Sequence, residues 1–283
     1  MRAKQRGEMI LDTSTAITGQ SAKRWRLSPA LRVSLLLHAA AAVLLATHPD
    51  AWLWGLAVLG ANHLGLFVAV LSPRGQLLGP NLVRLPAPAV RRREISLTFD
   101  DGPDPEVTPR VLELLDRYQA KASFFCIGEK AAAHPELVKE IARRGHSVEN
   151  HSYHHYNAFA FFSISRLRRE VDAAQGAVAA ITGRSPAFFR APAGFRSPLL
   201  DPVLASRGLR YVSWTRRGFD AVNGNSTRIL RGLTRGLAAG DVLLMHDRVP
   251  VVLSVLPALL EQVSAQGLKA VSLASACADE PVE

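Results

Sequence analysis

The stretch Ile95–Pro105, which reads Ile-Ser-Leu-Thr-Phe-Asp-Asp-Gly-Pro-Asp-Pro, decides how the chain folds. Its first five residues alternate apolar and hydroxyl side chains, a pattern that predicts a short strand. The strand ends in two adjacent carboxylates, Asp100 and Asp101, and a Gly-Pro turn follows. Successive side chains at such an edge point in different directions. One carboxylate can therefore bind a cation while the other accepts a proton, although Asp-Asp-Gly also occurs in ordinary turns.

From about Arg93 onward, short apolar strands alternate with helices whose ends are marked by proline and glycine. This order predicts an α/β fold with a parallel sheet, and about seven strands favour a deformed, nearly closed (β/α) barrel. The expected strands are 95–99, 122–127, 147–150, 187–190, 210–214, 241–245 and 269–273, and helices are expected to begin near 108, 134, 165, 197, 226 and 249.

Two apolar runs, 33–47 and 51–71, come before this domain. We expect both to be transmembrane helices, since the second is long enough to cross a bilayer and arginines flank the first. A removable signal peptide is disfavoured because another apolar run follows immediately. The predicted division is a basic flexible tail (1–30), a membrane anchor of two transmembrane helices (31–72), a linker rich in Pro, Gly and Arg (73–92), and the α/β domain (93–283).

The basic residues behind the formal charge of +10 are unevenly distributed along the chain. Basic residues cluster on both sides of the apolar runs, while the link His48-Pro49-Asp50 carries no Lys or Arg. Basic flanks favour the cytoplasmic side, so we predict a multi-pass protein of a bacterial-type inner membrane whose domain faces the cytoplasm. If the first run lies in the interface instead, the domain faces outward. The domain lacks an arginine-aromatic stripe, so nucleic acid is not an expected partner.

Polar residues follow several of the expected strands, and in such a barrel that edge carries the functional groups. His151 and His155 are four residues apart, which would place both imidazoles on one side of a helical turn around one metal ion. One carboxylate from the first strand end would complete three ligands with an open position, as in catalytic zinc sites. A histidine-rich surface loop is the alternative. Arg190 can orient a carboxylate, and His246 is expected to transfer protons.

Four short motifs in a fixed order identify the family that this domain resembles. Over about residues 93–276 it resembles the polysaccharide deacetylases of the NodB-homology type, carbohydrate esterase family 4. That family implies a deformed (β/α) barrel, one divalent metal ion, usually zinc, and an acylated amino sugar as substrate. The motifs are Thr98-Phe99-Asp100-Asp101-Gly102, His151-Ser152-x-x-His155, Arg190-x-Pro192 and Leu244-x-His246.

The resemblance also implies a role for each matched residue, and this chain departs from the family at two places. Ala193 stands where the third motif usually carries an aromatic residue, and 214–220 replaces the usual Asp-x-x-Asp-Trp. We therefore expect a substrate shape unlike that of polymer-trimming relatives. The implied roles are Asp101, His151 and His155 as metal ligands, Asp100 as general base, Arg190 as its orienting partner, His246 as general acid, Asp220 as the carboxylate that tunes His246, the backbone N–H of Ala193 as oxyanion donor, and Trp214 and Leu244 as pocket wall.

The expected function is metal-dependent hydrolysis of an N-acetyl group on an amino sugar. A domain on the cytoplasmic side cannot reach a finished wall polymer, so a lipid-linked glycan precursor is the expected substrate and the membrane an expected partner. Alternatives are an O-acetyl ester or an N-formyl group as the bond cleaved, and a non-catalytic membrane-anchored carbohydrate-binding domain. Phe159, Phe161 and Phe162 either pack under the next helix or form an apolar lip beside the groove.

Overall fold

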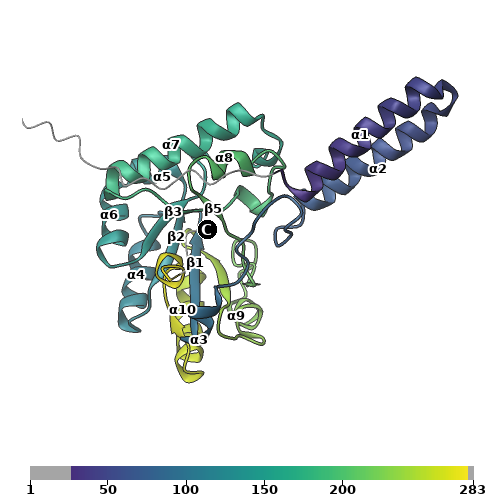
Figure 1. The fold of residues 1–283 in the computed structure, drawn as a ribbon. Coiled ribbons are helices and arrows are strands. Elements are labelled where there is room, and N and C mark those ends of the chain that lie inside the picture. The colour runs from purple at the N-terminus through teal and green to yellow at the C-terminus, as the bar shows by residue number, and fades with distance from the viewer. Residues whose placement is uncertain (1–26, 280–283) are drawn as a thin grey trace, which may run out of the picture.

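The computed structural model describes residues 27–279, which form a helical hairpin and an α/β domain (Figure 1). The hairpin consists of α1 (Pro29–Thr47) and α2 (Trp52–Val70), joined by the short 3-10 helix η1 (Pro49–Ala51). It extends away from the domain, and the start of α1 and the end of α2 both lie at the domain side. A hairpin that crosses a membrane would therefore carry its tight turn on the opposite side.

The hairpin helices face each other with polar side chains and expose apolar ones. The Asn62 amide donates to Ser34 Oγ at 3.0 Å, and the rings of His38 and His63 lie edge to face at 5.3 Å. Large apolar side chains line the outside, among them Trp54, which is 73% exposed. An exposed apolar surface of this size marks a membrane or protein contact. By length and composition, both helices are candidate membrane spans.

The domain is built on one parallel sheet that curves into a half-barrel. Its strands are β1 (Glu94–Asp100), β2 (Ala122–Cys126), β3 (Ser147–Asn150), β4 (Phe188–Phe189), β5 (Arg210–Tyr211), β6 (Arg216–Arg217), β7 (Val242–His246) and β8 (Lys269–Ala270). Their order is β5-β4-β3-β2-β1-β7-β6, and β8 pairs with the first residues of β1. The predicted α/β fold, a deformed barrel of about seven parallel strands, is confirmed.

Amphipathic helices connect the strands and cover the outer face of the sheet (Figure 1). In α4, for example, Val111, Leu112 and Leu115 are fully buried, because their spacing places them on one face of the helix. They belong to the main core, where Phe99 and Phe124 stack at 5.0 Å. The helices are α3 (Ala87–Arg91), α4 (Thr108–Arg117), α5 (Gly128–Ala133), α6 (Pro135–Arg143), α7 (Ile164–Thr182), α8 (Asp201–Ala205), α9 (Ser226–Thr234), α10 (Val252–Ala265) and α11 (Leu273–Ala276).

The register of the strands brings distant residues to one edge of the sheet. Asp100, the last residue of β1, pairs with His246 at the end of β7. On the other side, Asn150 at the end of β3 pairs with Phe189 of β4, so His151 and Arg190 follow neighbouring strand ends. Parallel strands place their carboxyl ends together, and four segments far apart in sequence therefore meet at this edge.

The segment 73–92, for which we predicted a linker, packs against the domain. It contains α3, and Leu82 forms a parallel bridge with Val212 beside β5. Leu85 and Ala89 are buried in a cluster with residues of β2 and β7. The sequence pattern did not predict this packing. The segment is rich in proline and glycine, and its buried apolar side chains occur singly, without a helical or strand period.

Candidate active site

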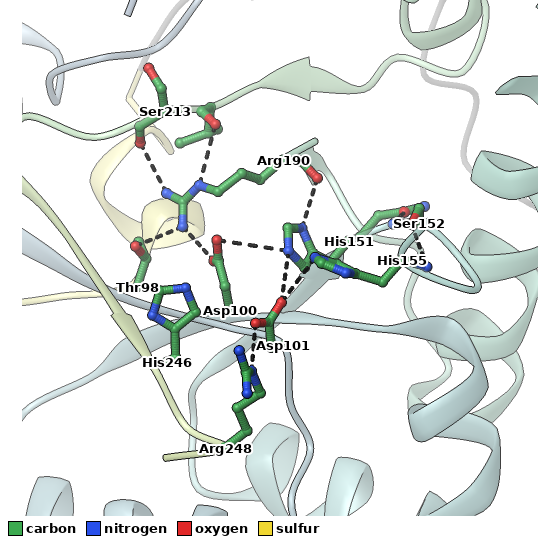
Figure 2. Close-up of polar contacts among 12 residues, drawn as sticks. Thr98, Asp100, Asp101, His151, Ser152, His155, Arg190, Ser213, His246 and Arg248 are labelled. Carbon is green, nitrogen blue, oxygen red and sulfur yellow. Dashed lines mark hydrogen bonds and ion pairs between the residues drawn. The ribbon is translucent and has the colours of Figure 1, made fainter. Parts of the chain in front are cut away.

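Asp100 and Asp101 close the central strand, and their side chains have different partners (Figure 2). Asp101 has a φ of 70°, a left-handed conformation that turns the chain out of the strand. Asp100 Oδ1 accepts from Arg190 Nη1 at 2.6 Å. Asp101 Oδ1 instead lies 3.3 Å from His151 Nε2 and 3.1 Å from His155 Nε2. Asp100 is thus held mainly by an arginine and Asp101 mainly by two histidines, and His151 Nε2 also lies 3.9 Å from Asp100 Oδ2.

Arg190 is fully buried and immobilised by several contacts. Besides Asp100, Nη1 donates to Thr98 Oγ1 at 2.9 Å, and Nη2 donates to the Ser213 carbonyl at 2.9 Å. Its guanidinium also lies 4.2 Å from the ring centroid of Phe125. A planar cation held in this way fixes the orientation of the Asp100 carboxylate.

Asp101, His151 and His155 form a compact donor cluster whose ligand atoms all lie within 4.8 Å of one another. The His151 Nδ1–H donates to the Arg190 carbonyl at 2.8 Å, so Nε2 faces Asp101. Burial raises the pKa of Asp101, but hydrogen bonds from both imidazoles outweigh burial and hold that pKa well below its ordinary value. The cluster is the one group of this kind among residues 27–279.

The two histidines meet through a loop, so the prediction that they share a helical turn is wrong. Ser152 and His155 have φ values of 61° and 55°, and no helix is present between 151 and 155. Ser152 Oγ accepts from the His155 N–H at 3.1 Å and stabilises this tight loop. The middle histidine, His154, turns away and pairs with Glu170 at 2.8 Å.

His246 lies beside Asp100 at the end of β7 and is held by Asp220. Its Nδ1 is 3.0 Å from Asp220 Oδ1, and its backbone N–H donates to Asp220 Oδ2 at 2.7 Å. Burial lowers the pKa of His246, but the hydrogen bond and the charge of Asp220 outweigh burial, so its pKa is above the ordinary value. An imidazole in this position is suited to donate a proton near neutral pH.

The remaining predicted residues lie around this edge. Ala193 has a φ of 55° in the 3-10 turn η3 (Pro192–Gly194), directly after β4 and Arg190. Trp214 and Leu244 are buried together in one cluster. A Cβ atom on Gly194 would come within 2.6 Å of the Trp214 ring, so this turn packs tightly against the tryptophan.

Two site contacts were missed at the sequence level. Arg248 Nε donates to Asp101 Oδ2 at 2.7 Å, and Lys130 Nζ donates to the Asp101 carbonyl at 2.8 Å. Arg248 comes two residues after His246, so its place after a functional strand end was an available signal. Lys130 lies on α5, a short helix without a sequence pattern that would have pointed to Asp101.

Comparison with known proteins identifies the family to which this chain belongs. The family described as polysaccharide deacetylase matches residues 87–212. A peptidoglycan-N-acetylglucosamine deacetylase of Bacillus cereus is 31% identical over 59% of this chain and 82% of that protein, and a chitooligosaccharide deacetylase of Bradyrhizobium sp. is 32% identical over 59% and 80%. A crystallised peptidoglycan N-acetylglucosamine deacetylase in complex with 4-naphthalen-1-yl-N-oxidanyl-benzamide superposes with a TM-score of 0.65 at 28% identity, over 69% of this chain and 91% of that chain. The chain therefore belongs to the polysaccharide deacetylases of carbohydrate esterase family 4 and is an enzyme that deacetylates sugar amides.

Proposed function

We propose that the chain removes the N-acetyl group from an amino sugar in a lipid-linked glycan precursor, with one divalent metal ion in its site. The observation that carries this proposal is the meeting of an arginine-held carboxylate, a three-residue donor cluster and a buried histidine at one edge of the sheet. Amide hydrolysis needs a base for the water, charge stabilisation for the oxyanion and an acid for the departing amine. The relatives named for acetylated amino-sugar glycans support this class of substrate.

The donor cluster fits a divalent cation, and we propose zinc. Two imidazole nitrogens and one carboxylate oxygen leave one position open, which is how catalytic zinc is held. The hydrogen bond from His151 Nδ1 to the Arg190 carbonyl orients the ring and leaves Nε2 as the donor, an arrangement typical of metal-bound histidine. A cation bound there would polarise the acyl carbonyl and make water a stronger nucleophile at neutral pH.

Asp100 is proposed as the general base and His246 as the general acid. Arg190 engages Asp100 Oδ1 at 2.6 Å, and Asp100 Oδ2 can accept a proton from the attacking water. His246, held by Asp220, donates a proton to the departing nitrogen, because an amine anion is too basic to leave. The backbone N–H of Ala193 is proposed to donate to the developing oxyanion, and the buried side chains of Trp214 and Leu244 to bound the acyl pocket.

We propose that the hairpin anchors the enzyme in a membrane, a position that would favour a lipid-linked substrate. The hairpin helices have mean hydropathies of 1.8 and 1.7 and expose most of their apolar side chains. The end of α2 packs on the domain through Ala69 and Val70, which contact Leu78 and Ala160. If the hairpin spans the bilayer, the domain is held next to the lipid surface, where a lipid-linked sugar is displayed.

The full chain in detergent or liposomes tests this proposal. Release of acetate and formate would be measured from lipid-linked N-acetylated sugars, their N-formyl and O-acetyl analogues, and polymeric glycans, with and without added zinc. We expect acetate release from the lipid-linked amide, with kcat/KM at least about tenfold higher than for the polymer. Faster release of formate or of the ester-linked acetate would favour the corresponding alternative, and preference for the polymer would contradict the precursor substrate.

A further inference from the structure

A pocket of about 360 Å³ lies beside the active site. The charged residues that line it have no role in the proposed hydrolysis. One wall belongs to the domain and contains Trp214, Arg217 and Phe219. The opposite wall is the segment 72–75, which follows the second hairpin helix and includes Arg74. We call this space the arginine pocket.

Neither arginine of the pocket forms an ion pair with a carboxylate among the residues that the structure describes. Burial lowers the pKa of Arg217, and the more distant charges of Asp220 and Asp100 offset this only in part. The Arg217 guanidinium lies 5.2 Å from the Trp214 ring and 4.1 Å from the Phe219 ring. Its Nε is buried and has no hydrogen-bond acceptor within residues 27–279. By contrast, Arg216, its neighbour in sequence, forms an ion pair with Asp241 at 2.5 Å. A buried N–H without a partner costs free energy unless a ligand satisfies it.

The arginine pocket also adjoins the proposed chemistry. The centroid of the Trp214 ring lies 5.8 Å from the Arg190 guanidinium and 5.2 Å from the Arg217 guanidinium. The turn that carries Ala193 packs against the same tryptophan at Gly194, next to Pro73 of the opposite wall. One tryptophan side chain therefore lies near both the guanidinium that holds Asp100 and a second guanidinium that forms no ion pair within residues 27–279.

We propose that the arginine pocket binds the phosphate group of a phosphate-linked amino sugar while its N-acyl group lies in the active site. This inference rests on the proposed function and names the group by which the lipid-linked substrate is recognised. Arginine binds phosphate with several charge-assisted hydrogen bonds, and aromatic rings such as Phe219 hold the guanidinium in place. The position of 72–75, directly after the membrane hairpin, places this phosphate at the level where a lipid carrier leaves the bilayer.

A ratio of rates tests the subsite separately from the chemistry. For each variant, kcat/KM would be measured on a prenyl-phosphate-linked N-acetylamino sugar and on the neutral glycoside of the same sugar. We expect the charged-to-neutral ratio to fall about 10- to 100-fold in Arg217→Gln and in the Arg74→Gln/Arg217→Gln pair, since each charged hydrogen bond contributes roughly 1.5–3 kcal/mol. Arg228→Gln, an exposed arginine on α9 outside the pocket, is the charge-matched control and should keep the ratio. A wild-type ratio in the double variant overturns the proposal.

A binding measurement keeps the subsite testable if the proposed function fails. Calorimetric titration of the detergent-solubilised full chain would compare N-acetylglucosamine 1-phosphate, its methyl glycoside, inorganic phosphate and phosphatidylglycerol micelles. We expect the sugar phosphate to bind at least about tenfold more tightly than the glycoside, and this advantage to disappear in Arg74→Gln, whose exposed side chain leaves the fold intact. Equal Kd values would overturn the proposal, and so would arginine-dependent binding of phosphatidylglycerol alone, which would identify a membrane contact.

Discussion

Two adjacent aspartates in this chain occupy different electrostatic environments, and the backbone explains why. Asp100 continues the strand and meets Arg190, whereas the positive φ of Asp101 turns its side chain toward His151 and His155. The resemblance to the family implied this division of partners, whereas the spacing alone left open which aspartate joins the two histidines. The position of Arg248 after a functional strand end marked it as a candidate, but its contact with Asp101 depends on how the loop after β7 folds back.

Substitutions at the two aspartates should separate metal binding from turnover. We expect Asp100→Asn to retain zinc and to lower kcat about 10²- to 10⁴-fold, because it removes the base and leaves the donor cluster intact. Asp101→Asn and His151→Ala should lose zinc and activity together, with affinity at least about 100-fold lower. Zinc content by atomic absorption and acetate release would be measured on each, with exposed Glu106→Gln as control. A near-wild-type rate for Asp100→Asn would show that the base is another group.

The pH dependence should depend on Asp220. His246 must be protonated to act as an acid, so activity is lost as pH rises through its pKa, and Asp220 raises that pKa through a hydrogen bond and its charge. Asp220→Asn removes the carboxylate charge in a side chain of similar shape. The alkaline limb of kcat/KM should therefore move to lower pH in the zinc-loaded variant. An unmoved limb would mean that His246 does not supply the titrating proton.

At the scale of secondary structure, the long patterns were predictable and the short ones were not. The alternation in β1 identified the strand, yet the alternating Ser96 and Thr98 are buried as well, because they face the barrel interior instead of water. The two-residue strand β6 and the helix α5 were not predicted, since so few residues carry no detectable period. A loop after β3 was expected, but its tight path through 151–155 was not, because its positive φ values occur at serine and histidine, where sequence gives no glycine signal.

The three phenylalanines after this loop divide between core and surface. Phe159 is fully buried and Phe162 is 7% exposed, whereas Phe161 is 69% exposed and follows Ala160, which packs against the end of α2. We expect Phe159→Ser to destabilise the fold by about 3 kcal/mol or more, and Phe161→Ser by less than about 0.5 kcal/mol. Thermal unfolding would measure both.

The activity of Phe161→Ser on a lipid-linked and on a soluble substrate then tests whether Phe161 contacts lipid. If it forms a lip at the membrane surface, Phe161→Ser should lower kcat/KM on a lipid-linked substrate and leave a soluble glycoside unaffected. Equal activity of wild type and variant on both substrates would limit the role of this segment to the packing of Phe159 and Phe162.

At the scale of the whole molecule, the structure distinguishes arginines that form ion pairs within the domain from those at the ends of the hairpin. Only the second group supports the predicted membrane topology. Arg84 pairs with Asp241 and Arg92 with Glu94, so these two arginines serve the fold of the domain. The basic residues Lys23, Arg24 and Arg26 of the predicted tail lie outside the described residues. Arg32, in the first turns of α1, and Arg74, after α2, remain at the two ends of the hairpin on its domain side.

The last prediction is that both ends of the hairpin face the cytoplasm. The turn His48–Asp50 carries no Lys or Arg, and basic residues precede α1 and follow α2, so the turn should be exported and the domain retained. Alkaline phosphatase is active only after export, so its fusion after Glu283 should be inactive, whereas green fluorescent protein at the same site should fluoresce. Deleting α1 as a control should leave one span, export the domain and activate the phosphatase. A strongly active phosphatase on the full chain would place the domain outside, where finished glycan polymers are accessible, and would contradict both the paired spans and the precursor substrate.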